Sequence, residues 1–446
     1  MRALCYSQLF SHLTPVQEWD ALMLETATLR ESLDSRNKEL STALYQYDAA
    51  CRVIARLEKE RDDARAALAA APAPKRVAED AMEVEAQAGV GKRAKGLPAD
   101  VLASIDATAA SLSAARRKRS VSADLASVEG VSRYAELHSL PLHKSSAPGI
   151  AAVAVHPGRP EVSASGGADK SVVVYARAAG GSAGGRKLAE LKGHAKGVTA
   201  LAFLSAAGAL VSGSEDRCLK LWAPEGGDEP SWRCAATVAA HAAPVSGVAV
   251  HPCGGFLASC ARDGCWALWD AETGGALWRS PPDAPAAPPL AAVAFHPDGL
   301  ILATAGADGC VRVWDTKSGA SAAKLEQPQP QPLAGLSFSE NGYHLAVAGD
   351  AGVALWDLRK LKCIRELGGG APATAVAFDH SGYFLAAGGA RPTVYAAKQE
   401  WAAVAEWEPL GGKKHVAALA WAPNAAALLV GASHDHTLRV YGMPSE

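Results

Sequence analysis

An aspartate followed six positions later by a tryptophan or tyrosine recurs along the last two-thirds of the chain. The six pairs are Asp169/Tyr175, Asp216/Trp222, Asp263/Trp269, Asp308/Trp314, Asp350/Trp356 and Asp435/Tyr441. A seventh copy keeps its aromatic at Tyr395 but has Gly389 in place of the aspartate, and neighbouring aromatics lie 39 to 47 residues apart. A period of roughly 40–45 residues is that of a four-stranded unit in a ring of such units. The sequence therefore predicts an all-β, seven-bladed propeller over residues 132–446.

The fourth copy shows how one unit is built. Its strands are expected at residues 290–295, 300–305, 311–314 and 320–325. His296-Pro297-Asp298-Gly299 has the composition of a turn, and Ala307-Asp308-Gly309 that of a tight hairpin. The seventh copy ends at Tyr441, five residues before the last residue given, so its outer strand must come from elsewhere. We expect residues 132–140 to supply it, which closes the ring and removes exposed sheet edges.

The repeated unit resembles the WD-repeat family. That resemblance implies a network in which the aspartate bonds a histidine before the inner strand, the histidine reaches a serine or threonine, and that hydroxyl reaches the indole. Two copies carry the whole set: His194, Ser212, Asp216 and Trp222 in one, and His241, Ser259, Asp263 and Trp269 in the other. Asp308 and Trp314 belong to the same network, but that copy and the others that keep the aspartate lack the histidine, which predicts incomplete networks. Because a buried charge is costly without partners, we assign these residues a structural role rather than a catalytic or metal-binding one.

Residues 17–70 follow a different pattern. No glycine or proline interrupts them, and apolar side chains recur at the first and fourth positions of a heptad. The core positions are Trp19, Leu22, Leu29, Leu33, Leu40, Tyr47, Ile54 and Leu57. Five to six heptads predict an oligomeric coiled coil, and the width of the apolar stripe favours more than two helices. The alternative is a long helix that lies on the propeller.

Residues 71–131 are predicted to be a linker. Pro72 and Pro74 end the preceding helix, and residues 71–97 have a low-complexity composition typical of disorder. A short helix is expected over residues 98–118. The basic run Arg116, Arg117, Lys118 and Arg119 is a candidate nuclear import signal, and its alternative is a solvated helix end.

Composition excludes several classes of function. The formal net charge is −2, which favours neither a membrane surface nor sequence-specific binding of nucleic acid. The nine cysteines are scattered, as in a reduced intracellular protein, and no apolar run reaches the roughly 18 residues of a membrane span. Histidines and cysteines do not occur at metal-ligand spacing, so we expect no metal and no cofactor.

The run at residues 18–57 resembles the coiled-coil region of the pre-mRNA-processing factor 19 family, most specifically at Tyr45, Asp48, Cys51 and Arg52. Further matches lie at residues 168–174, 338–343 and 356–362. The resemblance implies a homotetramer, a nuclear scaffold of the spliceosome-associated NineTeen complex in splicing and the DNA-damage response, and a propeller that recruits substrates for ubiquitylation. In that family the ubiquitin ligase activity belongs to a U-box before the coiled coil. Residues 1–16 show no U-box pattern and stay unassigned, so we expect this polypeptide alone to be inactive as a ligase.

Two other functions fit the propeller. The sequence Trp356-Asp357-Leu358-Arg359 matches the short W-D-x-R box of substrate receptors for cullin-type ubiquitin ligases. A generic propeller scaffold without either role is the third hypothesis.

Overall fold

A computed structural model describes most of the chain beyond residue 96. The described ranges are 97–117, 125–143, 149–177, 185–204, 208–225, 231–280, 287–329, 331–408, 415–422, 427–432 and 436–444. The chain divides into two compact units, residues 1–89 and 90–446, and every described residue belongs to the second. The predicted coiled coil, with its core positions from Trp19 to Leu57, therefore lies outside the described residues.

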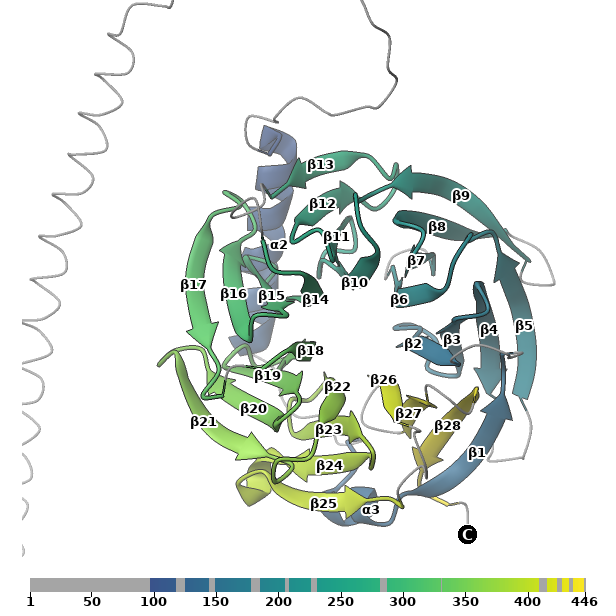
Figure 1. Ribbon diagram of the computed structural model, residues 1–446, viewed down its shortest axis with the longest axis vertical. Coiled ribbons are helices and arrows are strands. Elements are labelled where there is room, and N and C mark those ends of the chain that lie inside the picture. Colours follow the sequence, from purple (N-terminus) through teal and green to yellow (C-terminus); the bar gives the residue numbers. More distant parts are fainter. Residues whose placement is uncertain are drawn as a thin grey trace, which may run out of the picture. The chain divides into compact units, whose positions relative to one another are not determined.

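The described residues form seven four-stranded antiparallel sheets, which are arranged in a ring (Figure 1). Each sheet is called a blade. Blade 1 is β2 (Ile150–Val155), β3 (Val162–Gly167), β4 (Ser171–Arg177) and β5 (Gly185–Lys192); blade 2 is β6 (Val198–Phe203), β7 (Leu210–Ser214), β8 (Cys218–Glu225) and β9 (Ser231–Ala239). Blade 3 is β10 (Val245–Val250), β11 (Phe256–Ala261), β12 (Trp266–Asp270) and β13 (Ala276–Arg279); blade 4 is β14 (Leu290–Phe295), β15 (Ile301–Gly306), β16 (Cys310–Asp315) and β17 (Ser321–Glu326). Blade 5 is β18 (Leu333–Phe338), β19 (His344–Gly349), β20 (Gly352–Asp357) and β21 (Lys362–Leu367); blade 6 is β22 (Ala373–Phe378), β23 (Phe384–Gly389), β24 (Thr393–Ala396) and β25 (Ala402–Glu406), with the short helix η2 (Ala397–Gln399) between its last two strands.

Blade 7 joins the two ends of the ring. It combines β26 (Val416–Trp421), β27 (Ala427–Ala432) and β28 (Thr437–Gly442) with β1 (Ala135–Pro141), which pairs antiparallel with β28. The register places Ala135 opposite Gly442 and Pro141 opposite Thr437. The outer strand is thus supplied by the segment just before the first blade, and it pairs with the edge of β28 that would otherwise be exposed at the seam.

Adjacent blades approach closely because the second strands carry small residues. All six residues of β3, β11 and β23 are buried. A Cβ on Gly166 would lie 2.6 Å from Cγ1 of Val198, the first residue of the next blade. A Cβ on Gly213 would likewise lie 2.7 Å from Cγ1 of Val245, which begins blade 3. Larger side chains at these two glycines would push the blades apart, so the sequence of the second strands fixes the spacing of the ring.

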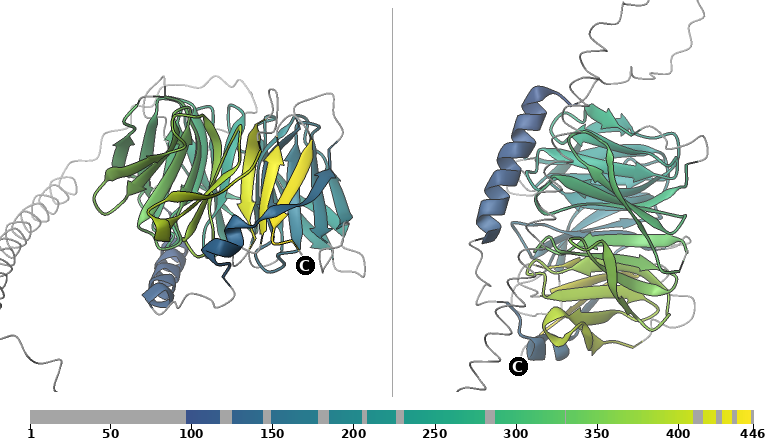
Figure 2. Two further views of the ribbon diagram at one scale, coloured as in Figure 1. Left: turned by 90° about the horizontal axis from the view of Figure 1, so that it is seen from below. Right: turned by 90° about the vertical axis from the view of Figure 1, so that its left-hand side faces the viewer.

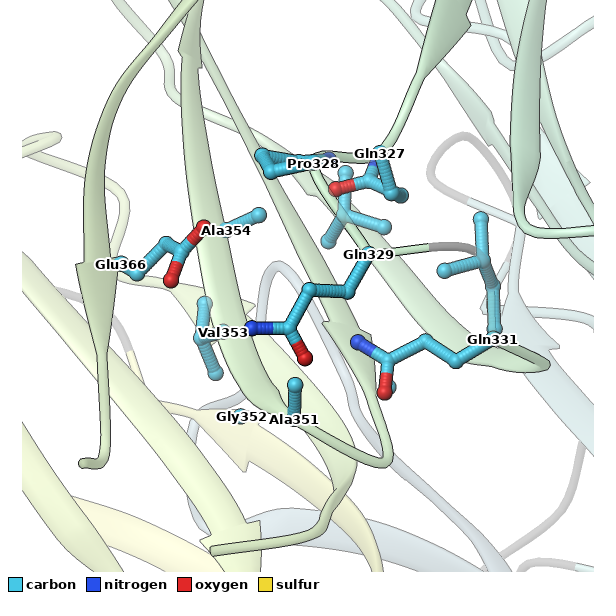
Figure 3. Close-up of a pocket in the computed structure, with 12 residues that line it drawn as sticks. Gln327, Pro328, Gln329, Gln331, Ala351, Gly352, Val353, Ala354 and Glu366 are labelled. Carbon is cyan, nitrogen blue, oxygen red and sulfur yellow. The ribbon is translucent and has the colours of Figure 1, made fainter. Parts of the chain in front are cut away.

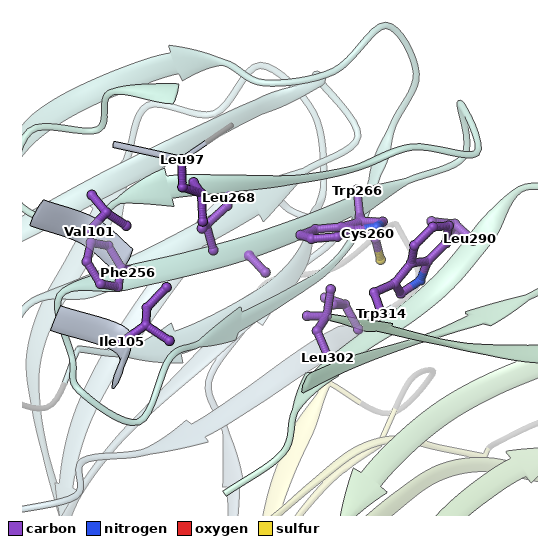
Figure 4. Packing of buried hydrophobic residues seen from close by; sticks show 12 residues of the cluster. Leu97, Val101, Ile105, Phe256, Cys260, Trp266, Leu268, Leu290, Leu302 and Trp314 are labelled. Carbon is purple, nitrogen blue, oxygen red and sulfur yellow. The ribbon is translucent and has the colours of Figure 1, made fainter. Parts of the chain in front are cut away.

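Helix α2 (Ala99–Arg117) lies across blades 3 and 4 on one flat face of the ring (Figure 2). Its buried residues Val101 and Ile105, together with Leu97, join the cluster around Phe256 and Leu268 (Figure 4). Asp106 of the helix also forms an ion pair with Lys317, in the turn after β16. The helix expected at 98–118 therefore packs on the propeller, whereas its segment was predicted to be a linker.

The chain returns to the same face in a second, shorter helix, α3 (Val128–Ser132). The hydroxyl of Ser127 caps this helix by accepting a hydrogen bond from the Gly130 N–H at 2.9 Å. Val131 is fully buried in a cluster with Phe384 and Tyr441, which anchors the approach to β1. Across the described ranges, no helix has the length and apolarity to cross a bilayer.

Candidate functional site on the blade turns

The predicted network of blade 2 gathers at the turn between its second and third strands. His194 Nδ1 lies 2.9 Å from Asp216 Oδ2, and its Nε2 lies 2.7 Å from the Ser212 hydroxyl oxygen. The indole N–H of Trp222 donates to the same oxygen at 2.9 Å. The four residues predicted from the sequence are thus joined in one chain of hydrogen bonds.

Blade 3 repeats the arrangement with its own residues. His241 Nδ1 lies 3.2 Å from Asp263 Oδ2, its Nε2 lies 2.8 Å from the Ser259 hydroxyl, and the Trp269 indole donates to that hydroxyl at 2.8 Å. Arg279 from β13 adds a second side-chain partner for Asp263, at 2.9 Å. The outer strand therefore reinforces this network from the rim.

Burial and hydrogen bonding fix the charge states of the blade 2 network. Burial lowers the pKa of His194, although Asp216 acts in the opposite direction. Burial opposes ionisation of Asp216, but hydrogen bonds from His194 and from the N–H groups of Ala195 and Cys218 outweigh it and hold the carboxyl pKa below its usual value. A neutral imidazole beside a carboxylate follows, with Nδ1–H donating to the aspartate and Nε2 accepting from the serine.

The Ser-His-Asp order of these residues is also that of a hydrolase triad. In such an enzyme the serine oxygen must be open to substrate. Ser212 and Ser259 are both 0% exposed, and each oxygen already accepts an indole N–H. The geometry therefore supports the structural role and leaves no room for nucleophilic attack.

Blade 1 corrects the expectation that the other copies lack a histidine. His143, which follows the closing strand β1, places Nδ1 3.0 Å from Asp169 and Nε2 2.9 Å from Ser165. Burial lowers the pKa of His143, with Asp169 opposing the shift. The segment that completes blade 7 thus also completes the network of blade 1, except that Tyr175 stands where blade 2 has a tryptophan.

Blades 4 and 5 use other side chains at these positions. The Trp314 indole donates a hydrogen bond to the Thr304 hydroxyl at 2.9 Å. The Asp308 carboxylate accepts a hydrogen bond from the Arg312 guanidinium at 2.8 Å, where blade 2 has a histidine as the partner. In blade 5 the Gln327 amide oxygen accepts the Trp356 indole at 3.4 Å. In blade 6, Gly389 stands at the aspartate position, as the sequence indicates. Asp435 of the last copy lies outside the described residues.

Sequence reasoning missed a second set of histidines, in the turns between first and second strands. His251 Nε2 lies 3.1 Å from the Gly299 carbonyl oxygen of blade 4, and His296 Nε2 lies 3.0 Å from the Gly342 carbonyl oxygen of blade 5. Each is buried and bridges to the following blade. The recurring His-Pro dipeptide at these turns is the sequence signal that could have identified them.

The remaining candidate residues are placed only in part. Arg116 and Arg117 end helix α2, while Lys118 and Arg119 lie outside the described residues. Within the W-D-x-R box, Asp357 binds Arg359 at 2.9 Å, and Trp356 is buried. Among the residues described, no group of three or more His, Cys, Asp or Glu is placed to hold a metal ion.

Comparison with known proteins covers both the propeller and the N-terminal region. Residues 7–71 match the family model described as Prp19/Pso4-like, and residues 185–223, 232–270, 287–315 and 408–442 match the WD domain, G-beta repeat. The chain is 37% identical over 448 residues to Pre-mRNA-processing factor 19 of Oryza sativa subsp. japonica, which covers 96% of this chain and 83% of the rice protein.

Two further relatives agree. Pre-mRNA-processing factor 19 homolog 2 of Arabidopsis thaliana is 36% identical over 446 residues, and the alignment covers 96% of this chain and 83% of the Arabidopsis protein. Pre-mRNA-processing factor 19 of Homo sapiens is 39% identical over 197 residues, 42% of this chain and 38% of the human protein. Because the two plant alignments run through the N-terminal segment and the propeller alike, the chain belongs to the pre-mRNA-processing factor 19 family.

Proposed function

We propose that this protein is a nuclear scaffold of pre-mRNA splicing, of the NineTeen-complex type, which oligomerises through residues 17–70 and recruits proteins on its propeller. The observation that carries the proposal is the alignment with the rice protein across 96% of the chain. The Prp19/Pso4-like match over residues 7–71 adds support, because it falls on the segment with the heptad pattern.

The blade networks favour a scaffold over an enzyme in the propeller itself. Their histidines and serines are buried and bonded to one another, so they stabilise turns instead of facing a substrate. Ubiquitin ligase activity and a part in the DNA-damage response are included in the proposal as properties of the family, with the propeller holding the substrates to be modified.

Affinity capture of the tagged full chain from cells that express it tests the scaffold role. Mass spectrometry of the captured proteins should show splicing factors as the main class. Recovery of a cullin adaptor, lost in Arg359→Ala, would replace the proposal with the receptor hypothesis. Recovery of neither class would leave a generic propeller scaffold.

Oligomerisation is tested by placing charges in the heptad core. Leu33→Asp with Leu40→Asp should convert a tetramer into a monomer, because each buried carboxylate costs several kcal/mol without a partner. Ser35→Asp with Ser41→Asp adds the same charge outside the core positions and should stay tetrameric. Light scattering of the full chain reads the mass, and a monomeric wild type would refute the assembly.

Nuclear import is tested at the end of α2. Changing Arg116, Arg117, Lys118 and Arg119 to alanine should move a fluorescent fusion of the full chain out of the nucleus. An unchanged nuclear signal would assign the cluster to a solvated helix end.

A further inference from the structure

The face of the ring opposite α2 carries charges that differ from blade to blade. Helix α2 lies by the turns that join first to second and third to fourth strands, so the loops between blades and the turns after second strands share the opposite face. At blade 5, Gln329, Gln331 and Glu366 surround a recess on this face (Figure 3), and Asp350 lines the hollow beside it. At blades 1 to 3 the same turns and loops carry exposed lysines and arginines. The face therefore has an acidic part and a basic part.

Four exposed cations make up the basic part, and we call them the basic strip. They come from the turn after the second strand of blade 1, the loop between blades 1 and 2, and the corresponding turns of blades 2 and 3: Lys170, Lys196, Arg217 and Arg262. Among the residues that the structure describes, their side chains form no ion pair. The nearby Asp216 carboxylate, in contrast, already accepts a histidine and two backbone N–H groups. The strip thus presents positive charges without fixed counter-charges.

Backbone contacts place the basic strip in a row that follows the ring. A Cβ on Gly197, in the loop between blades 1 and 2, would lie 3.2 Å from the Ala168 Cα in the turn of blade 1. The Gly197 carbonyl oxygen also accepts the Glu215 N–H from the turn of blade 2 at 3.0 Å. The next loop is attached in the same way, since the Arg262 N–H donates to the Pro244 carbonyl oxygen at 3.0 Å. The cations are therefore spread over three blades instead of surrounding one point.

Two cations of the strip have a backbone conformation that favours glycine. Lys170 has a φ of 70° and Arg217 a φ of 72°, both in the left-handed region. Blades 3 and 4 have Gly264 and Gly309 at the corresponding positions, with φ values of 74° and 75°. A side chain in this region crowds its own backbone, so lysine and arginine fit these turns less well than glycine does. Local backbone strain of this kind is typical of functional positions, and here it retains two long cations on one face.

A row of separated cations suits several carboxylates along one peptide. Arginine and lysine bind a carboxylate through charge-assisted hydrogen bonds. At physiological salt the attraction between exposed charges is screened within about 8 Å, so each cation acts mainly on the anion nearest to it. An extended chain advances about 3.3 Å per residue, so acidic residues a few positions apart can reach successive cations. A single phosphate group could engage only part of the row.

A nucleic acid fits the basic strip less well than an acidic peptide does. The exposed Glu215 carboxylate stands between Lys196 and Arg217 in the sequence, and a regular run of phosphates would meet it. A peptide can place a neutral residue at that point. Proteins that bind single strands also use exposed aromatic rings on which bases stack. The large apolar side chains that are exposed among the described residues all lie outside blades 1 to 3: Tyr343, Leu361, Ile364 and Met443.

We propose that the basic strip of blades 1 to 3 binds an extended segment of a partner protein that is rich in aspartate and glutamate. The carboxylates of the segment pair with Lys170 and Arg217, and further carboxylates pair with Lys196 and Arg262. A neutral residue of the segment lies over Glu215. The inference deepens the proposed recruiting role and depends on it in that the ligand is a protein.

The test uses the full chain and a labelled probe, fluorescein-Gly-Glu-Glu-Ala-Asp-Glu-Ala-Glu-Asp-Gly, followed by fluorescence anisotropy. We expect saturable binding that the matched peptide with glutamine and asparagine in place of the acids does not show. Lys170→Gly with Arg217→Gly should weaken binding by about tenfold, since it removes two of the four charges. The midpoint of urea denaturation of this variant should not fall, because glycine suits both left-handed positions.

Two control variants separate charge at the strip from charge elsewhere. Lys360→Gln with Lys362→Gln removes two exposed cations of blade 5 and should leave the affinity for the acidic probe unchanged. Lys170→Arg with Arg217→Lys keeps both charges of the strip and should keep most of the affinity.

Three outcomes overturn the proposal. The first is no saturation at millimolar acidic probe. The second is an equal loss of affinity in the glycine variant and the blade 5 variant, which would show general attraction to a charged surface. The third is tighter binding of an oligouridylate of equal charge, or of a peptide with one phosphoserine, which would assign the strip to phosphate groups. Affinity capture with the wild-type chain separates these results from the proposed function, because splicing factors can be recovered even where the probe does not bind.

Discussion

Blades 2 and 3 carry complete hydrogen-bond networks, whereas blades 5 and 6 have lost most of theirs. In blade 2 the histidine, aspartate, serine and tryptophan form one chain of contacts of 2.7–2.9 Å. In blade 5 a single contact of 3.4 Å from Trp356 to Gln327 takes its place. Both pairs of blades nevertheless have four strands in the same order.

This difference separates what builds the ring from what stiffens its turns. Apolar packing between neighbouring blades persists everywhere, for example Val347 and Leu345 in blade 5 and Leu385 in blade 6, all almost fully buried. Hydrophobic contact therefore suffices for the blade, while the polar network adds stability to one turn. Where the network is mostly absent, as in blade 5, the four strands still pair and their apolar side chains still pack.

The largest effect should come from removing the aspartate of a complete network. Asp216→Ala leaves His194 and the N–H groups of Ala195 and Cys218 without their acceptor, and should lower the free energy of unfolding by about 2–3 kcal/mol. Asp350→Ala changes an exposed carboxylate and should cost less than about 0.5 kcal/mol. Urea denaturation of both variants measures the contrast, and equal losses would mean that the network does not distinguish the blades.

The sequence predicted the repeat, the complete networks of blades 2 and 3, and the origin of the closing strand. It did so because each depends on residues at a regular spacing. His143 was missed because it precedes β2 by seven residues, whereas His194 precedes β6 by four, and because it follows a strand of another blade. The docking of α2 was missed because its apolar residues, such as Val101 and Ile105, match a patch that only the folded ring presents. Irregular spacing and long-range contact thus set the limit of the prediction.

The second prediction asks whether the network at the ring closure behaves like that of blade 2. His143→Ala removes one hydrogen-bond partner each from Asp169 and Ser165 and should cost about 2 kcal/mol. His138→Ala, in the closing strand itself, is the matched control and should cost less than about 0.5 kcal/mol. If urea denaturation shows the same loss for both, the closing segment contributes through its strand alone.

Acid should destabilise the networks of blades 1 and 2. Burial lowers the pKa of His143 and of His194, so below the unfolded value of about 6.5 the unfolded chain takes up protons that the folded chain does not. Stability is then full above pH 6.5 and falls as the pH decreases toward the folded values, by up to about 1.4 kcal/mol per pH unit for each proton. His143→Gln with His194→Gln should flatten the slope of unfolding free energy between pH 6.5 and 5. Above pH 7 its curve should run parallel to that of the wild type, and an unchanged slope at lower pH would assign the acid sensitivity to other groups.

The smallest effect concerns the aromatic at the end of the network. The Trp222 indole donates to Ser212 at 2.9 Å, but the buried Tyr175 hydroxyl of blade 1 has no partner among the described residues. Burial also raises the pKa of Tyr175, as expected of a hydroxyl removed from water.

Tyr175→Phe removes an unsatisfied polar group with almost no change of volume and should stabilise the fold by up to about 1 kcal/mol. Trp222→Phe is the matched change in a complete network and should destabilise it, since it deletes a made hydrogen bond and part of a buried ring. Urea denaturation of the two variants should therefore give shifts of opposite sign. A loss of stability in Tyr175→Phe would mean that the hydroxyl has a partner in the folded chain, and that blade 1 belongs with blades 2 and 3 after all.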